Sequence, residues 1–283
     1  MRRLLQDRRA AAGTVLLTSA VVLAVAAPLV STGYPAAQRD VVATRFLPPL
    51  ASDVNGAFHM LGTDRFGRDV WTRLVYGGRI SLAVGGLAVL LSVAIGVVVG
   101  GAAGYGPGPI RTLLLGVTDF AIALPRVVLL LLLAAFARPS AGLVILLLGF
   151  TGWMSVARLV QGEVRSLAVR PFVEGAAALG LPRRRVLARH ILPNALTPVI
   201  VSAALGLANA ITLEASLSFV GLGVQPPTPS WGNMIASGRD TLVNAPWVAV
   251  APGVALAVVV VACTLLGDAL QDALQPASRW ERT

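Results

Sequence analysis

The stretch ISLAVGGLAVLLSVAIGVVVGGAAG, residues 80–104, contains no charged residue in 25 positions. A helix rises about 1.5 Å per residue, so this run is longer than is needed to cross about 30 Å of hydrocarbon. The whole chain of 283 residues has a similar character, because 56% of its residues are hydrophobic, 13% are charged, and its mean hydropathy is +0.78. These values predict a polytopic membrane protein rather than a soluble domain.

The same criterion of length and missing charge predicts five more membrane-spanning helices. They are expected at residues 10–30, 112–137, 141–157, 195–222 and 245–267. The first run could also be a cleaved signal peptide, but it is longer than the usual apolar core of about 7–15 residues. An uncleaved first helix is therefore predicted, and the fold class is an all-α bundle of six transmembrane helices.

Arginine counts predict the orientation in the membrane. With the N-terminus inside, fourteen arginines lie in cytoplasmic segments and eight lie outside. Cytoplasmic loops of membrane proteins carry the excess of basic residues, so both termini are expected on the cytoplasmic side. The expected location is a bacterial inner membrane. The same bias explains the net charge of +10 without a nucleic-acid partner.

This topology divides the chain into four parts. They are a cytoplasmic N-terminus with the first helix (1–30), an extracytoplasmic segment (31–79), a five-helix core (80–267) and a cytoplasmic tail (268–283). The stretch DVWTRLVYGGR at the end of the second part predicts an amphipathic interfacial helix that leads into the core. The core includes a cytoplasmic loop at 160–194 and an outer loop at 221–246.

Several kinds of chemistry are excluded by composition. All 23 basic residues are arginine, so the chain has neither the lysine of a nucleotide-binding P-loop nor a Schiff-base lysine. The single cysteine, Cys263, cannot form an intrachain disulfide, and the two histidines, His59 and His190, lack the spacing of metal ligands. No catalytic motif of a membrane-embedded enzyme is present. The sequence therefore predicts no catalytic residue, no metal site and no enzyme activity.

Two features of the core predict helix packing and a bent loop. Gly96, Gly100 and Gly104 recur at every fourth position, which favours close approach of a neighbouring helix. The basic stretch EGAAALGLPRRRVLARHILPNAL, residues 174–196, contains Gly180, which can end a helix in the left-handed conformation. Prolines predict the remaining boundaries: Pro182 opens a second short helix, Pro193 closes it, and Pro198 starts the fifth span.

The loop resembles the "EAA" loop of ABC-importer permeases. The matching positions are Glu174, Ala176, Ala177, Gly180, Leu192 and Pro193. Gly175 replaces an alanine of that pattern, and His190 stands where an aliphatic residue is usual. Three further segments, LGTDRFGRDV (61–70), LSFVGLGVQPPTPSWGNMI (217–235) and GDALQDALQP (267–276), resemble the C-type permease subunit of dipeptide, oligopeptide and nickel importers.

The resemblance implies an ABC type I importer permease with partners. The expected partners are a second, homologous permease, two cytoplasmic ATPase subunits or domains that hold ATP and Mg, an extracytoplasmic substrate-binding protein, and membrane lipid. The resemblance also implies that the loop docks on the ATPase. The residues expected at that contact are Glu174, Gly175, Ala176, Ala177, Gly180, Leu181, Pro182, Leu192 and Pro193.

Three charged residues fall inside predicted spans: Asp119, Arg126 and Glu214. A charge at the centre of a bilayer costs about 2.5–3.5 kcal/mol, so each must face protein or water. Asp119 and Arg126 are seven residues apart, which predicts one helix face, a separation of about 10 Å and a kink at Pro125. Either these charges line or gate a translocation path, or they form buried structural contacts.

Together these features predict a permease subunit for ATP-driven import of dipeptides or oligopeptides. The same architecture could carry nickel chelates or a haem-like ligand instead. An ion-coupled secondary transporter is a further alternative, but it would ordinarily show inverted repeats or paired broken helices, and it would have no use for a docking loop.

Overall fold

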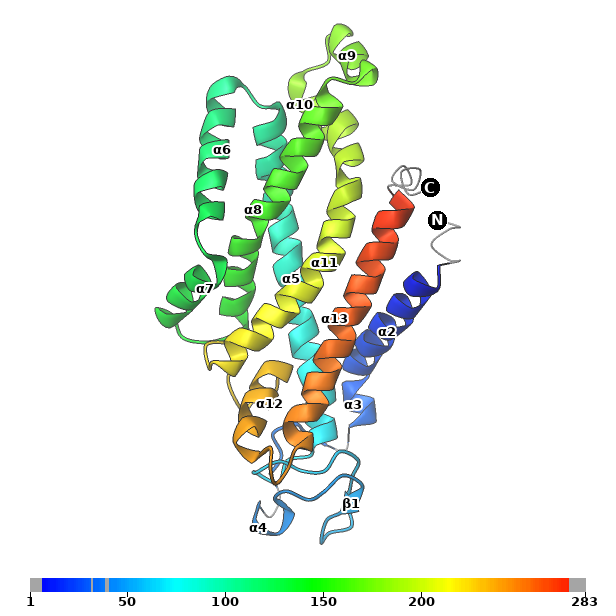
Figure 1. The fold of residues 1–283 in the computed structure, drawn as a ribbon, viewed down its shortest axis with the longest axis vertical. Helices are drawn as coiled ribbons and strands as arrows, with labels where there is room; N and C mark the ends of the chain where they lie inside the picture. Colours follow the sequence, from blue (N-terminus) through cyan, green and yellow to red (C-terminus); the bar gives the residue numbers. More distant parts are fainter. Residues whose placement is uncertain (1–6, 32, 39–40, 275–283) are drawn as a thin grey trace, which may run out of the picture.

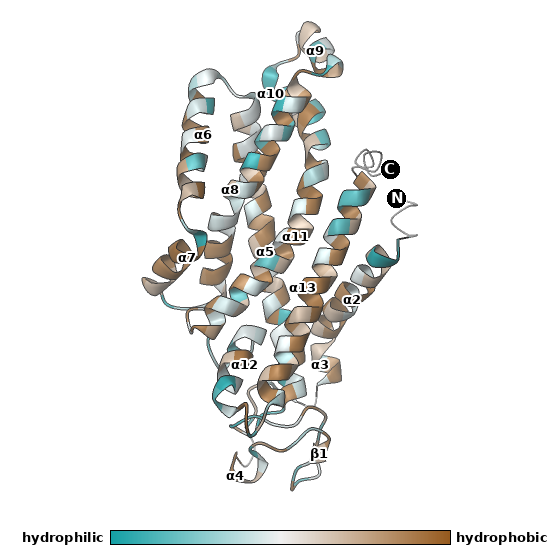
Figure 2. Ribbon diagram, in the orientation of Figure 1, coloured by the Kyte–Doolittle hydropathy of each residue, from teal (hydrophilic) through white to brown (hydrophobic). Residues whose placement is uncertain are grey.

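The structure is a computed structural model that describes residues 7–31, 33–38 and 41–274. It is an elongated bundle of helices with a small loop region at one end (Figure 1). The longest helices are α2 (Arg8–Val25), α5 (Val70–Tyr105), α8 (Ala141–Ala168), α11 (Leu192–Phe219) and α13 (Trp247–Leu274). Hydrophobic residues cover most of their surfaces, and hydrophilic residues are more frequent near the two ends of the bundle (Figure 2). Helices that are apolar on most sides are typical of membrane proteins.

Five helices are long and apolar enough to cross a membrane, and a bent pair brings the total to six when it counts as one span. Helices therefore occupy all six segments predicted as spans, with shifted ends. After α2, a short helix α3 (Ala27–Val30) completes the first span, and α8 extends eleven residues beyond the predicted end at residue 157. Because α13 continues to Leu274, the predicted tail at 268–283 begins inside a helix. The rest of that tail, Arg39, Asp40 and the arginines at positions 2 and 3 lie outside the described residues.

The kink predicted at Pro125 is present, but it divides the third span into two helices, so the prediction that Asp119 and Arg126 share one helix face is wrong. The bent pair consists of α6 (Gly108–Ala123) and α7 (Arg126–Ala135), whose axes meet at 85°. Leu124 and Pro125 between them are extended, with ψ of 132° and 108°. Proline disfavours helical backbone in the residue before it and cannot donate a backbone hydrogen bond, so the helix stops there. Asp119 and Arg126 therefore belong to two helices and do not share one face.

The predicted boundaries at two prolines of the basic loop are also wrong. Three short elements precede α11, namely α9 (Pro171–Ala178), α10 (Arg183–Val186) and a π-helical turn, η1 (Leu187–Ile191). From α10 onward the chain stays helical through Pro193 and Pro198. In the π turn the N–H of Leu192 donates to the carbonyl oxygen of Leu187, five residues earlier. Pro193 follows in the first turn of α11, where a missing N–H is tolerated.

The predicted interfacial helix at residues 70–79 is not a separate element. Asp69 caps the first turn of α5 by accepting the N–H of Thr72 at 2.7 Å, and the helix then continues to Tyr105. Val70 is 1% exposed and packs beside Met234 rather than at a lipid surface. The first turns of α5 are thus covered by the loops at this end of the bundle and lie inside the fold.

Residues between α3 and α5 form a compact segment at one end of the bundle. It contains α4 (Val41–Thr44) and the antiparallel strands β1 (Ala51–Ser52) and β2 (Phe58–His59), in which Ala51 pairs with His59. Buried polar contacts stabilise it: Arg68 pairs with Asp64 at 2.7 Å, and His59 Nδ1 hydrogen-bonds Asp69 at 2.8 Å. This segment lies at the opposite end of the bundle from α9 (Figure 1). The loop that connects α11 to α13 carries α12 (Trp231–Gly238) and the 3-10 turn η2 (Arg239–Thr241).

The close helix approach predicted from the glycine spacing is confirmed. A Cβ atom added at Gly96, Gly100 or Gly104 would lie 2.6, 2.4 or 2.6 Å from the nearest atom of α8. At Gly100 that atom is the backbone oxygen of Ala157. Such distances leave no room for a side chain, so the glycines allow the backbones of α5 and α8 to meet.

We expect Gly100→Ala to destabilise the protein by about 1–3 kcal/mol, because the added methyl group meets backbone that cannot rotate away. The melting temperature of the detergent-solubilised protein measures the effect. Gly86→Ala in the same helix is the matched control, because a Cβ atom there has no neighbour within 4 Å. Equal melting temperatures for the two variants would contradict the packing argument.

Candidate functional site

The element that the sequence singled out, α9, ends in a sharp and well-defined turn. Gly180 has φ of +78°, the left-handed conformation that only glycine adopts at little cost. Its N–H donates to the oxygen of Ala177 at 2.9 Å, and the N–H of Leu181 donates to that of Ala176 at 3.4 Å. These two bonds form a Schellman motif, which satisfies carbonyl groups at the helix end and reverses the chain. The predicted role of Gly180 as a helix terminator is confirmed.

One side of α9 is fastened to the bundle. Val173 and Ala176 are buried in a cluster with Val186 of α10 and with Val160 and Val164 of α8. Leu181 and Leu192 are half-buried against the same cluster. Apolar packing therefore holds the short helix in a fixed position at the tip of the molecule (Figure 1).

The other side of α9 is open. The remaining residues predicted at the ATPase contact are exposed: Glu174, Gly175, Ala177, Gly180, Pro182 and Pro193. Leu179 beside them is 84% exposed, an unusual position for a large apolar side chain at the tip of a loop. A small, partly apolar surface with one carboxylate is suited to insertion into a recess of another protein.

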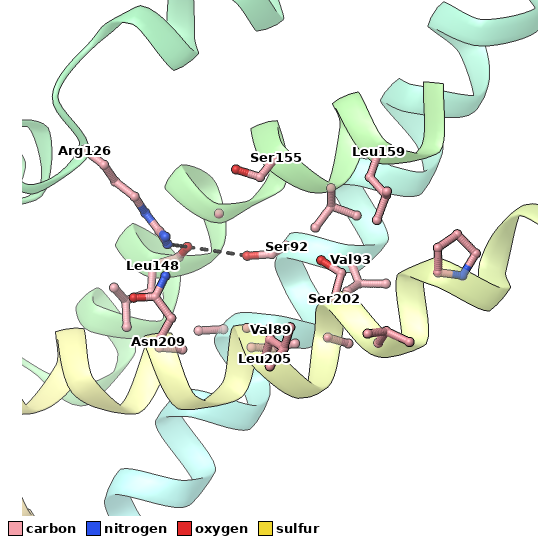
Figure 3. Close-up of a pocket in the computed structure, with 18 of the residues that line it drawn as sticks. Val89, Ser92, Val93, Arg126, Leu148, Ser155, Leu159, Ser202, Leu205 and Asn209 are labelled. Carbon is pink, nitrogen blue, oxygen red and sulfur yellow. Dashed lines mark hydrogen bonds between the residues drawn. The ribbon is translucent and has the colours of Figure 1, made fainter. Parts of the chain in front are cut away.

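A second candidate site is a cavity of about 530 Å³ between α5, α8 and α11. Its wall is mainly apolar, with several neutral polar side chains and one charge (Figure 3). The polar residues are Ser92 from α5, Ser155 from α8, Ser202 and Asn209 from α11, Gln271 from α13, and Arg126 from the start of α7. A mainly apolar wall with a few polar groups is typical of small-molecule sites.

Arg126 is the only residue of the predicted charged trio that lines this cavity. Its Nε donates to Thr151 Oγ1 at 3.2 Å, and its Nη2 donates to the backbone oxygen of Leu148 at 3.4 Å. Figure 3 shows the Arg126 side chain reaching from the start of α7 toward Leu148, on the side opposite Ser92. A Cβ atom on Gly152 would lie 3.3 Å from Nη2, so the glycine leaves room for the guanidinium group.

Asp119 lies elsewhere, on α6, where it forms an ion pair with Arg158 of α8. Both side chains are about half exposed, at 52% and 47%. Asp119 therefore contacts neither Arg126 nor Glu214, and the idea of a buried pair between Asp119 and Arg126 is wrong. The break at Pro125 explains this result, because it turns the two residues away from each other.

Glu214 is fully buried near the C-terminal end of α11. Ser81 of α5 donates to one carboxyl oxygen at 2.8 Å, and Ser218 donates to the other at 2.7 Å. Backbone N–H groups complete the network, because Trp231 donates to Ser81 Oγ at 3.2 Å and Val224 donates to Ser218 Oγ at 3.0 Å. The carboxyl group thus joins α5, α11 and the start of α12.

The sequence analysis did not identify the neutral polar residues of the cavity or those of the network around Glu214. Serine is common in membrane helices, so Ser81 and Ser92 carried no individual signal. Asn209 could have been noticed, since an amide inside an apolar span requires a partner or a cavity. Arg158 was assigned to a cytoplasmic segment, because the span was expected to end one residue before it.

Comparison with known proteins agrees with this geometry. Residues 82–280 match the family model described as "binding-protein-dependent transport system inner membrane component". The chain belongs to this family. The match includes α9 and every cavity-lining residue, so both candidate sites lie in the part of the permease component that the family shares.

Several curated relatives of this permease component are similar over nearly their whole length. A putative peptide transport system permease protein of Brucella abortus is 39% identical over 280 residues, which cover 99% of this chain and 92% of the relative. The dipeptide transport system permease protein DppC of Bacillus subtilis is 37% identical, with 98% and 85% covered. The oligopeptide transport system permease protein OppC of Haemophilus influenzae is 33% identical, with 98% and 88% covered.

A solved structure supports the fold. The inward-facing MetNI methionine ABC transporter contains a chain that superposes with a TM-score of 0.57, at 20% sequence identity. The similarity covers 71% of this chain and 96% of that chain. The permease component therefore has the fold of an ABC-transporter membrane subunit, as the sequence predicts.

Proposed function

We propose that this chain is a permease subunit that forms part of the path for dipeptides or oligopeptides in an ATP-driven importer. The observation that carries the proposal is the agreement among relatives. Proteins 33–39% identical to it, from several genera, are named as permeases of peptide, dipeptide or oligopeptide systems. The chain itself supplies no ATP chemistry, and ATP and Mg are held by partner ATPase subunits.

The cavity between α5, α8 and α11 supports a small cargo. Its volume of about 530 Å³ falls in the range of about 300–1,000 Å³ that is usual for small-molecule sites. Serine and amide side chains offer hydrogen bonds to a peptide backbone without fixing the identity of its side chains. In the proposal a second, homologous permease covers the open side of this cavity, and an extracytoplasmic binding protein delivers the peptide to the outer loops.

The surface around α9 supports docking on the ATPase. Its exposed residues are small or apolar, and Glu174 offers a carboxylate to a basic group of the partner. The first residues of α2 and the last residues of α13 point toward the same end of the bundle as α9 (Figure 1). If α9 faces the cytoplasm, both termini do so as well, in agreement with the arginine count.

Uptake of a labelled dipeptide tests the proposal. The chain is expressed with the proteins encoded beside it in a bacterial strain that lacks its own peptide permeases. We expect uptake that requires an active ATPase partner and persists when an uncoupler removes the proton gradient. Uptake that needs no ATPase and collapses with the uncoupler would instead identify an ion-coupled carrier.

Competition identifies the cargo in the same cells. An excess of unlabelled dipeptide should abolish uptake, whereas a nickel chelate or haem should leave it unchanged. Uptake of nickel or haem without any uptake of dipeptide would replace peptide as the cargo while keeping the importer architecture.

A further inference from the structure

Arg126 occupies a position that no other charged residue in the described chain shares. It lines the cavity of about 530 Å³ and also a smaller one of about 90 Å³ between α6, α7 and α8. Ser155 is the other residue common to both walls. The guanidinium group therefore lies where the two cavities meet, beside the bend at Pro125.

This arginine differs from the other interior arginines in what it contacts. Arg68 and Arg73 lie within ion-pair distance of Asp64, and Arg158 pairs with Asp119. Within residues 7–31, 33–38 and 41–274, Arg126 forms no ion pair, and its recorded partners are a hydroxyl and a backbone oxygen. Both partners are neutral, so the positive charge is not balanced by a described carboxylate.

The surroundings favour an anion. The other polar side chains of the larger cavity are neutral, so Arg126 alone determines the sign of the charge there. Two of its five N–H donors serve Thr151 and Leu148, which leaves donors for a further acceptor. A planar guanidinium group binds a carboxylate with two parallel hydrogen bonds, and a mainly apolar wall strengthens that attraction.

We propose that Arg126 binds the carboxylate of the cargo during its passage and thereby favours peptides with a free C-terminus. The inference rests on the proposed function, since it assumes that peptides enter this cavity. Hydrogen bonds to Thr151 and Leu148 hold the guanidinium group in place without neutralising it. A Cβ atom on Gly152 would lie 2.3 Å from Ser92 Oγ and 3.3 Å from Nη2 of Arg126, so this glycine makes room first for Ser92 and then for the guanidinium group.

The test compares two labelled substrates, alanyl-alanine and its C-terminal amide, in cells that carry the whole importer. The measured quantity is the ratio of ATPase-dependent uptake of the free acid to that of the amide. The binding protein has its own preference, but it is the same in every strain, so that preference cancels when ratios are compared between variants. Folding yield cancels as well, because both substrates are measured with the same protein.

For Arg126→Met we expect the ratio to fall roughly tenfold, which corresponds to one lost hydrogen-bonded contact to a charged group. Arg126→Lys keeps the charge and should retain most of the ratio. Arg138→Met is the matched control, because Arg138 is exposed and lines neither cavity, and its ratio should equal that of the wild type.

An unchanged ratio in Arg126→Met would overturn the inference, even if total uptake fell, because that result describes a residue that only fastens α7 to α8. In that case uptake by the wild type would leave the proposed function intact. Failure of the wild type to take up either substrate would remove the proposed function, and the inference with it.

Discussion

Replacing Gly180 with valine is expected to lower peptide uptake by roughly tenfold or more while the importer still assembles. At φ of +78° a residue with a side chain is strained by about 1–2 kcal/mol, and a β-branched one suffers most. That strain shifts the equilibrium between the native turn and other conformations by roughly 5–30-fold against the native turn. No atom lies within 4 Å of a Cβ atom at this position, so the effect comes from backbone conformation and not from a clash.

Two control variants separate backbone conformation from other causes. Gly180→Asn should retain uptake, because asparagine tolerates the left-handed region. Gly162→Ala should also retain it, because that glycine is exposed, lies within α8 outside the predicted ATPase contact, and has no neighbour within 4 Å of an added Cβ atom. The amounts of this chain and of the ATPase that co-purify are measured for each variant. Wild-type uptake by Gly180→Val, with normal assembly, would count against docking through α9.

Replacing Glu214 with leucine is expected to lower the melting temperature of the purified protein by roughly 10 °C. Leucine has a similar size but leaves the hydroxyl groups of Ser81 and Ser218 without their acceptors inside a fully buried site. Each buried polar group without a partner costs about 1–3 kcal/mol. The damage should be concentrated at the contact between α11 and α12, which this network connects.

Glu214→Gln is the matched control for this prediction. The amide oxygen still accepts one hydroxyl hydrogen bond, and the amide nitrogen can donate to the second hydroxyl oxygen. Its melting temperature should therefore lie close to that of the wild type. If Glu214→Leu and Glu214→Gln both melt at the same temperature as the wild type, the hydrogen bonds of Glu214 do not stabilise the C-terminal end of α11.

The number of helices and their approximate positions could be predicted because they depend on a local property. Twenty or more apolar residues without charge can satisfy their backbone in a bilayer only as a helix. Gly180 was also predictable, since its missing side chain permits the turn that follows α9. The spacing of Gly96, Gly100 and Gly104 predicted the close approach of a neighbouring helix, but not that this helix is α8.

Prolines show where prediction from sequence fails. Pro125 ends a helix with a bend of 85°, whereas Pro193 and Pro198 lie within a continuous helical path. The difference comes from the neighbouring backbone, which is extended before Pro125 and forms a π turn before Pro193. The residue type proline therefore does not predict whether a helix breaks or continues at that position.

Ion pairs and hydrogen bonds between residues far apart in the sequence could not be predicted either. Asp119 pairs with Arg158, 39 residues later, and Ser81 reaches Glu214 across 133 residues. The cavity depends on how α5, α8 and α11 pack, so its neutral polar residues had no local signature. Arg126 was noticed for its charge, but its place between two cavities required the tertiary structure.

The unbroken helical path through η1 has a mechanical consequence. From Arg183 to Phe219 it comprises 37 residues, a rod of roughly 55 Å. One end adjoins α9, the middle carries Ser202 and Asn209 into the cavity, and the far end is linked to α5 by the hydrogen bond between Ser81 and Glu214. A tilt imposed at the α9 end would make this rod a lever with its pivot along the cavity wall. A small displacement of the α9 end would then move the Glu214 end in the opposite direction.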